Sequence, residues 1–508
     1  MYASIASGVL FGARGHLVDV EVHVAKGLPG FQIVGLPDAS VRESRDRVRA
    51  AIQSIGLKFP DIKITVNLAP SESPKSGSAL DLAIAIGVLS ADQHIPVAAL
   101  DGLAAVGELG LDGSVRPVPG VAPIVGAVAD HEVIVPCSSQ REALVAAGGA
   151  VRPVADLAEV LGVLGRGDPW PVHPMPDTSS APPSPPDLSD VRGQPLPRRA
   201  LELAAAGGHH LLFVGPPGSG KTMLAARLPG LLPPLERQEA LDVTMVHSAA
   251  GVALPPGGLV TRPPFRSPHH TSSQVAIIGG GSHALRPGEV SIASGGVLFL
   301  DELPEFARSV LDTLRQPLES GEVHVARAAV SARLPARFQL VAAMNPCPCG
   351  HRGEKPGSCE CGADRAQRYV ARVSGPLVDR FDLRVNVTPP DAELILSPQP
   401  GESTAIVAER VHVARDRAIA RQGCLNAQVS GAELDRVAPL EPEALDLARS
   451  ELERGRLTGR GYHRVRRVAR TIADLAGGGT TIGAEQLALA LQLRHALQSD
   501  GTPGRWAA

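Results

Sequence analysis

Hydrophobic and polar residues alternate along the first 165 residues in the manner of an α/β fold. Residues 16–25 carry a valine at every second position from Val18 to Val24, which predicts a strand with one buried face. Residues 39–56 repeat hydrophobic positions every three to four residues, which predicts an amphipathic helix. The same reasoning predicts strands at 63–70 and 132–136, a helix at 79–89, and a hairpin at 104–118 that turns at Asp112-Gly113.

The second half of the chain changes from α/β to helical patterning. Residues 210–228 predict a strand, a glycine-rich loop and the start of a helix. Buried strands are predicted at 295–303 and 338–346, and helices after about Pro390 at 402–422, 444–456, 461–477 and 483–497. A parallel α/β core followed by a small helical lid is the order typical of AAA+ ATPases.

A proline-rich segment divides the two halves. Eight of the 20 residues from Asp168 to Asp187 are proline, and hydrophobic periodicity is lost there, which predicts a semi-rigid, exposed linker. A proline-rich docking peptide is the alternative. We therefore predict an N-terminal domain over 1–167, a linker over 168–187, a core over 188–390, and a lid with a tail over 391–508.

Composition narrows the class of protein. The 508 residues are 44% hydrophobic and 20% charged, with a net charge of −3, which excludes a disordered chain and a histone-like polycation. Only 2 Trp, 3 Tyr and 9 Phe are present, so binding by aromatic base stacking is not expected. The N-terminus lacks a signal-peptide pattern, and no hydrophobic run approaches the ~18 residues of a membrane span. We expect a cytoplasmic protein with no membrane contact.

The glycine-rich loop matches G-x-x-x-x-G-K-[ST], the P-loop pattern that binds nucleotide phosphates. Glycines let the main chain approach phosphate, and the helix N-terminus adds positive potential. Lys221 is expected to reach the β- and γ-phosphates, and the Thr222 hydroxyl to ligate Mg²⁺. Asp301, which ends the strand VLFLDE, is expected to hold Mg²⁺, and Glu302 to act as general base. The remaining predicted ATP-binding residues are Gly215, Pro216, Pro217, Gly218, Ser219 and Gly220.

Three further residues are predicted to act on the γ-phosphate from their places in this pattern. Asn345 ends the strand LVAAMN and fits the sensor-1 position, which orients the attacking water. Arg380 in SGPLVDRFDL is the predicted arginine finger, which would reach the nucleotide of a neighbouring subunit. Arg460 opens a lid helix and fits the sensor-2 position, with Arg464, one turn later, as the alternative.

Several stretches resemble the ComM/YifB family of magnesium-chelatase-like ATPases. They include PFRSPHHTSSQVAIIGGG, RPGEVSIASGGVLFLDELPEF, AAMNPCPCG and GYHRVRRVARTIADLAG. The resemblance implies an AAA+ module with a helix-2 insert, a homo-hexameric ring, and a DNA helicase that drives branch migration in natural transformation. The insert would lie at 279–290, and a hairpin at 322–334 carries Arg327 and Arg333; both would line the ring's pore. His269 and His270 receive no role.

The N-terminal segment around PKSGSALDL resembles the Lon protease domain. Counted from Pro74, the Lon nucleophile position falls at Ala79, with Ser78 one position early, and the lysine position falls at Ala122. Both groups that a Ser-Lys dyad needs are missing. The resemblance therefore implies a Lon-like fold without protease activity.

Four cysteines lie within 15 residues, directly after the predicted sensor-1 strand. Cys347, Cys349, Cys359 and Cys361 form C-x-C, nine residues, then C-x-C. Four thiolates at this spacing can close a tetrahedral Zn²⁺ site. A metal-free loop, reduced or disulfide-linked, is the alternative.

The leading functional hypothesis is an ATP-driven motor that acts on branched or single-stranded DNA without reading its sequence. A magnesium-chelatase motor subunit is the second hypothesis, and a protein-remodelling AAA+ ATPase is the third. The expected cofactors are ATP, Mg²⁺ and a structural Zn²⁺.

Overall fold

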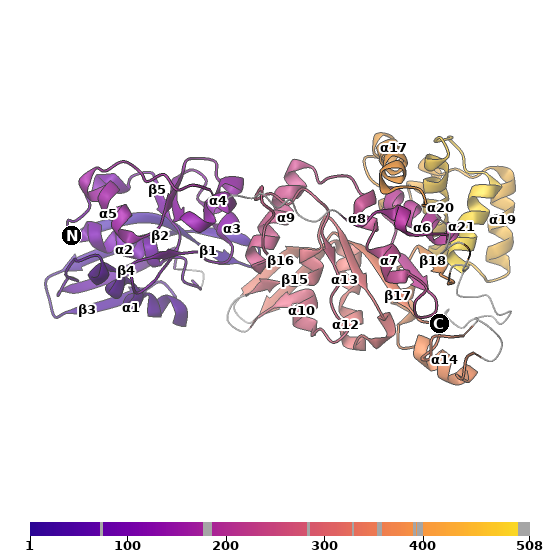
Figure 1. Cartoon of the computed structure of the whole chain (residues 1–508), viewed down its shortest axis with the longest axis horizontal. Coiled ribbons are helices and arrows are strands. Elements are labelled where there is room, and N and C mark those ends of the chain that lie inside the picture. The colour runs from indigo at the N-terminus through magenta and orange to yellow at the C-terminus, as the bar shows by residue number, and fades with distance from the viewer. Residues whose placement is uncertain are drawn as a thin grey trace.

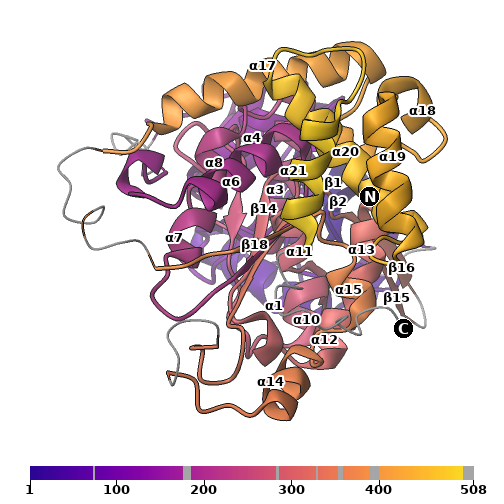
Figure 2. The same ribbon diagram turned by 90° about the vertical axis from the view of Figure 1, so that its right-hand side faces the viewer.

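The computed structural model describes residues 1–71, 75–175, 185–281, 285–327, 330–352, 358–389, 393 and 400–495. Three blocks follow one another along the long axis of the molecule (Figure 1). The N-terminal unit lies at one end, the parallel sheet of the second unit lies in the middle, and the C-terminal helices lie at the other end. The view along this axis places helices α17, α19, α20 and α21 in front of the central sheet (Figure 2).

The N-terminal unit is built on a seven-stranded mixed sheet in the order β3-β4-β2-β1-β5-β8-β9. β1 pairs antiparallel with β2 over its whole length, with Tyr2 opposite His23, and β2 is the strand that the alternation of valines predicted. The predicted hairpin is present as the short antiparallel pair β6 and β7. The strands are β1 (Tyr2–Phe11), β2 (Arg14–Ala25), β3 (Gly30–Val34), β4 (Lys63–Ala69), β5 (Leu103–Ala105), β6 (Glu108–Leu109), β7 (Val115–Arg116), β8 (Glu132–Pro136) and β9 (Val151–Val154).

The helices of this unit bury different amounts of their surface. α1 turns only one hydrophobic face to the sheet, through Val41, Val48 and Ile52, as its periodicity predicted. Every residue of α2 is buried, which explains why its sequence is hydrophobic on all sides except at Asp81 and Ser90. The helices are α1 (Ala39–Ser54), α2 (Asp81–Ala91), α3 (Val121–Ala127), α4 (Gln140–Ala146) and α5 (Leu157–Arg166).

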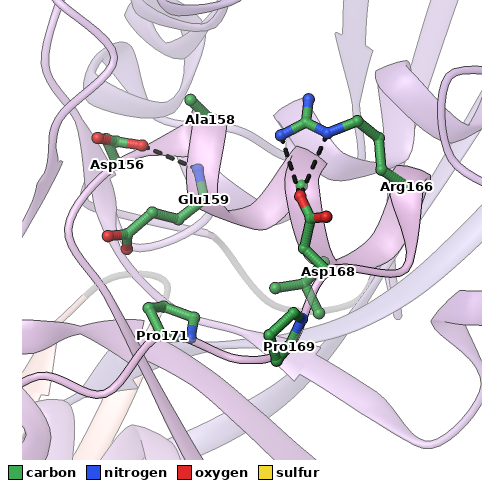
Figure 3. A pocket seen from close by; sticks show the side chains of 9 residues that line it. Asp156, Ala158, Glu159, Arg166, Asp168, Pro169 and Pro171 are labelled. Carbon is green, nitrogen blue, oxygen red and sulfur yellow. Dashed lines mark hydrogen bonds and ion pairs between the residues drawn. The ribbon is translucent and has the colours of Figure 1, made fainter.

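The first residues of the predicted linker fold back on α5 instead of standing clear of the domain. Arg166 forms an ion pair with Asp168 at 3.2 Å, and a small pocket lies between α5 and the prolines that follow (Figure 3). Trp170 is half-buried, with the guanidinium of Arg152 5.4 Å from the centre of its ring. Most of these residues are nevertheless exposed, as expected of a linker, and Trp170 anchors the segment to the hydrophobic core of the N-terminal unit. Residues 176–184 of the linker lie outside the described residues.

The second unit contains a five-stranded parallel sheet in the order β11-β14-β17-β10-β18. The α/β fold with a parallel sheet is thus confirmed. Its three central strands are completely buried and read as hydrophobic runs, as expected of a parallel sheet covered on both faces. The strands are β10 (Leu211–Val214), β11 (Phe265–Arg266), β14 (Val297–Leu300), β17 (Gln339–Met344) and β18 (Leu383–Asn386).

Two short hairpins extend from this core. β15 (Glu322–Arg327) and β16 (Val330–Pro335) pair antiparallel, as predicted, and β12 (Gly279–Gly280) pairs with β13 (Arg286–Pro287). Within β15 and β16, Val323 and Leu334 are buried, whereas His324 and Arg333 are exposed cross-strand partners. The side chain of Arg327 and residues 282–284 lie outside the described residues.

Helices cover the central sheet and then form the C-terminal block. Those around the sheet are α6 (Pro195–Gly207), α7 (Lys221–Ala225), α8 (Leu228–Leu231), α9 (Arg237–Ala250), α10 (Gln274–Ile278), α11 (Glu289–Ile292), α12 (Arg308–Thr313), α13 (Arg315–Ser320), α14 (Ala363–Val370) and α15 (Gly375–Val378). The C-terminal ones are α17 (Thr404–Gln422), α18 (Leu434–Val437), α19 (Pro442–Glu453), α20 (Gly459–Leu475) and α21 (Ala484–His495). Within the described ranges, none has the length and hydrophobicity needed to cross a bilayer.

Candidate nucleotide-binding site

The glycine-rich loop lies between the C-terminal end of β10 and the N-terminus of α7. Gly218 and Gly220 have φ values of +73° and +90°, a region that residues with a side chain rarely adopt. A Cβ at Gly215 would lie 2.1 Å from the carbonyl oxygen of Val387, so only glycine fits there. These glycines let the loop curve tightly at the helix N-terminus, where backbone N–H groups and the helix dipole favour an anion.

Lys221 lies across the loop with only 8% of its surface exposed. Its Nζ donates to the carbonyl oxygens of Gly215 at 2.8 Å and Pro216 at 2.7 Å, and to Oδ1 of Asn345 at 3.2 Å. Burial lowers the pKa of Lys221 from its ordinary value, and the nearby carboxylates of Asp301 and Glu302 oppose that shift. The structure therefore brings Asn345 directly to the P-loop lysine.

The two acids at the end of β14 lie beside the loop. Thr222 donates its hydroxyl to Oδ2 of Asp301 at 2.6 Å, which places together the two groups predicted to hold Mg²⁺. Glu302 adopts φ +52° and ψ +47°, the left-handed region, where a non-glycine residue is uncommon. β17 lies between β10 and β14, so Asn345 ends its strand between the P-loop and the acidic pair.

His270, which sequence analysis left without a role, contacts the predicted general base. Its Nδ1 lies 3.1 Å from Oε2 of Glu302. The ring lies against that of His269, tilted by 34° with centroids 4.1 Å apart, and makes an edge contact with buried Phe306 at a centroid distance of 6.4 Å. His270 follows β11, the strand next to β14, and that adjacency brings it to Glu302. The imidazole is thus placed where it can orient the carboxylate, as a third group orients the base in many catalytic sites.

We expect His270→Ala to lower the kcat of ATP hydrolysis by roughly tenfold and to leave KM nearly unchanged, since the lost hydrogen bond to a charged group is worth roughly 1.5 kcal/mol. His270→Asn, whose amide can still donate to Glu302, should retain most of the turnover. Steady-state phosphate release checks both variants. A rise in kcat for His270→Ala, or an equal loss in the asparagine variant, would contradict an orienting role.

Two polar groups on the P-loop side fit a nucleotide. Gln194 precedes α6 and donates from Nε2 to the carbonyl oxygens of Ser219 at 2.6 Å and Thr388 at 3.2 Å. The Ser219 hydroxyl is buried and finds no hydrogen-bond partner among the described residues. A buried polar atom of this kind needs a partner, and a phosphate oxygen supplies one. The loop and the Thr222–Asp301 pair therefore fit ATP with Mg²⁺.

The predicted arginines lie near the N-terminal ends of the parallel strands, whereas the P-loop and the acidic pair lie at their C-terminal ends. Arg380 precedes β18, which runs parallel to β10, whereas the P-loop follows β10. The length of a four-residue strand, roughly 13 Å at 3.3 Å per residue, separates the two ends. Arg464 donates to Oδ1 of Asp382 at 2.6 Å and to the Arg380 carbonyl at 3.0 Å, whereas Arg460 is exposed in the first turn of α20.

Arg380 is surrounded by other cations. Its guanidinium pairs with Glu319. Partial burial, followed by the charges of Arg464, Arg460 and Arg315, lowers the pKa of Arg380 from its ordinary value. A cluster of guanidinium groups favours an added anion. The structure does not bring Arg380 or Arg460 to the P-loop of the same chain.

The four cysteines converge after β17. The Sγ atoms of Cys347, Cys349 and Cys359 lie 3.4–3.7 Å apart, and all four Sγ atoms lie within 4.8 Å of one another. Zn–S bonds of about 2.3 Å place the corners of a tetrahedron about 3.8 Å apart, which matches these distances. All four are free thiols. The disulfide-linked alternative is therefore wrong here, because these sulfurs are too far apart to be bonded.

Comparison with known proteins identifies the family of this chain. A protein of Mycobacterium tuberculosis is 47% identical over 491 residues, covering 95% of this chain and 97% of its own length. YifB of Escherichia coli is 43% identical, covering 91% of each chain, and competence protein ComM of Haemophilus influenzae is 42% identical, covering 94% of each. This chain belongs to the ComM/YifB family.

Family models cover most of the described structure. Those described as "Subunit ChlI of Mg-chelatase", "Magnesium chelatase, subunit ChlI" and "Magnesium chelatase, subunit ChlI C-terminal" match residues 20–139, 187–395 and 401–494. The ComM/YifB chain thus contains magnesium-chelatase-like AAA+ domains, as predicted.

A cleft of about 1640 Å³ lies between the N-terminal unit and the core. Residues within 247–265 form part of its lining, and none of the predicted site residues lines it.

Proposed function

We propose that this chain is an ATP-hydrolysing motor that assembles as a homo-hexamer and moves branched or single-stranded DNA independently of sequence. The observation that carries the ATPase is the convergence of Lys221, Asn345 and the Thr222–Asp301 pair at one edge of the parallel sheet, beside Glu302. The name of a relative, competence protein ComM, supports a role in competence. A helicase driving branch migration is the activity that we propose.

Each residue contributes a separate part of the hydrolysis step. The P-loop N–H groups and Lys221 bind the phosphates and stabilise charge that develops on them. Bound Mg²⁺, held by Thr222 and Asp301, would neutralise phosphate charge. Glu302, oriented by His270, accepts a proton from the attacking water, and Asn345 orients that water. Arg380 acts on the nucleotide of a neighbouring subunit, because it precedes β18 and so lies at the opposite end of the strands from its own P-loop. Arg460 serves as the sensor-2 arginine.

The remaining assignments complete this proposal. Residues 1–167 form a Lon-like domain without a protease dyad, 168–187 a linker, 188–390 the AAA+ core, and 391–508 the lid and tail. Ala79 and Ala122, at the two dyad positions, are both buried alanines. A structural Zn²⁺ is held by Cys347, Cys349, Cys359 and Cys361. The protein is cytoplasmic. The β15–β16 hairpin contacts DNA phosphates in the ring's pore through Arg333 and His324.

The decisive experiment uses a synthetic four-way DNA junction. We expect the purified chain to bind the junction and, when ATP is supplied, to dissociate it into duplexes by branch migration. The Lys221→Ala variant should leave the junction intact. Arg333→Ala should weaken junction binding and reduce its dependence on salt, because a phosphate contact is lost. If the chain hydrolyses ATP but neither binds nor moves the junction, the DNA motor is wrong.

A magnesium-chelatase motor subunit is the second candidate, favoured by the family descriptions. Insertion of Mg²⁺ into a porphyrin, measured with added chelatase partner subunits, tests it directly. ATP-dependent chelation together with an unmoved junction would favour this candidate over the DNA motor.

A further inference from the structure

The turn that carries the first two cysteines presses against the P-loop. Gly350 donates its N–H to the carbonyl oxygen of Cys347 at 3.0 Å, which closes the turn, and has φ +88°. A Cβ at Gly350 would lie 2.4 Å from Cδ of Pro217 and 2.8 Å from its Cγ. The main chain of the cysteine turn is therefore in van der Waals contact with a proline in the loop that would bind phosphate.

The same cysteine segment reaches two other parts of the nucleotide site. Cys347, which is fully buried, follows Asn345 by two residues along the chain. α14 begins two residues after Cys361. Arg372, which follows α14, forms an ion pair at 3.0 Å with Glu305, in the turn that follows Asp301 and Glu302 along the chain. α14 lies at the lower edge of the core, at the opposite side of the view from α17 (Figure 2).

The four thiols lie between the turn that contacts Pro217 and the segment that leads into α14. Cys347 and Cys349 belong to the turn on Pro217, and Cys359 and Cys361 lead into α14. A metal ion bound by both pairs would fix the turn and α14 relative to each other. Without an ion, the thiols offer only weak S–H hydrogen bonds.

We infer that this cysteine unit, the turn 347–350 joined through bound Zn²⁺ to Cys359 and Cys361, is a brace for the nucleotide site. With the metal bound, Gly350 supports Pro217 and holds the P-loop in the shape that binds ATP. Loss of the metal frees the turn, and ATP affinity falls. The inference rests on the proposed ATPase function, but the metal content of the protein can be measured independently of it.

Glycine substitutions test the contact of Gly350 with Pro217 separately from zinc binding by the cysteines. Gly350→Ala keeps all four thiols but introduces a methyl group against Pro217 at a left-handed position. Gly362→Ala is the matched control, because that glycine is also beside a cysteine, has φ −59°, and has no atom within 4 Å of an added Cβ. Cys359→Ser removes one ligand. Cys361→His, made in the otherwise unchanged chain, replaces one cysteine ligand by histidine and leaves a Cys₃His set, which also binds zinc.

The measurements are zinc per chain by elemental mass spectrometry under reducing conditions, and the Kd of a fluorescent ATP analogue. We expect one zinc per chain and unchanged affinity for the wild type and Gly362→Ala. Gly350→Ala should keep its zinc and lose about tenfold in affinity, the size of effect common for residues that support a site. Cys359→Ser should lose both zinc and affinity, and Cys361→His should keep both. Thermal unfolding checks that Gly350→Ala and Cys359→Ser remain folded.

The outcomes distinguish the brace from the proposed function. Wild-type affinity in a zinc-free Cys359→Ser protein, or in zinc-loaded Gly350→Ala, would overturn the brace and leave the ATPase intact. Wild-type protein without stoichiometric zinc, or with iron in its place, would overturn the metal assignment. A wild-type chain that carries zinc but does not bind the analogue would overturn the proposed function, and the brace with it.

Discussion

We expect Glu302→Gln to lower ATP turnover by about 10²–10⁴-fold and to bind ATP almost as well as the wild type. The amide of glutamine has the shape of the carboxylate but cannot accept a proton from water. The phosphate- and magnesium-binding groups, Lys221 and the Thr222–Asp301 pair, are unchanged by this substitution. Steady-state phosphate release and equilibrium binding of a fluorescent ATP analogue measure the two quantities separately.

Two controls define the result for Glu302. Lys221→Ala should lose binding as well as turnover, because it removes the cation expected at the phosphates. Glu443→Gln, at an exposed position in the first turn of α19, should match the wild type in both assays. Normal turnover by Glu302→Gln with normal binding would show that another group activates water. In that case the left-handed conformation of Glu302 would need a different explanation.

The hydrophobic pattern predicted the core of the fold because burial determines it locally. β10, β14 and β17 are each buried at every position, and apart from Gln339 at the start of β17 they are hydrophobic throughout. The alternation of β2 likewise follows from one buried face. The order of strands was not predictable in this way. It depends on pairings such as Leu211 with Val341, which lie far apart along the chain.

The site was predicted where residues belong to a recognisable sequence motif or spacing, including Asn345 at the end of its strand and the two C-x-C pairs. The P-loop and the acids at 301–302 have such motifs, whereas His270 does not. It reaches Glu302 because β11 pairs with β14, and a strand of two residues is too short to show a period. The contact of Gly350 with Pro217 also joins distant segments, and its signal in the sequence is a single glycine.

Arg380→Ala is expected to lower ATP turnover by roughly 10³-fold or more, the effect of removing an arginine finger. The register of β18 on β10 places Arg380 at the end of the strands opposite the P-loop, so we expect this loss to arise at a neighbour's active site. ATP binding to the variant's own P-loop should remain close to the wild type. Arg449→Ala, exposed on α19, is the control and should retain full turnover.

Mixing two inactive variants tests whether Arg380 acts between subunits. In rings assembled at random from equal amounts of Lys221→Ala and Arg380→Ala chains, a competent site needs an intact P-loop beside an intact Arg380. If arginine acts in trans, about one quarter of the sites meet that condition, and turnover should recover toward this fraction. If Arg380 acted within its own chain, every site in the mixed ring would lack one group, and turnover would stay at the level of the separate variants. Co-expression with two affinity tags isolates the mixed rings for this measurement.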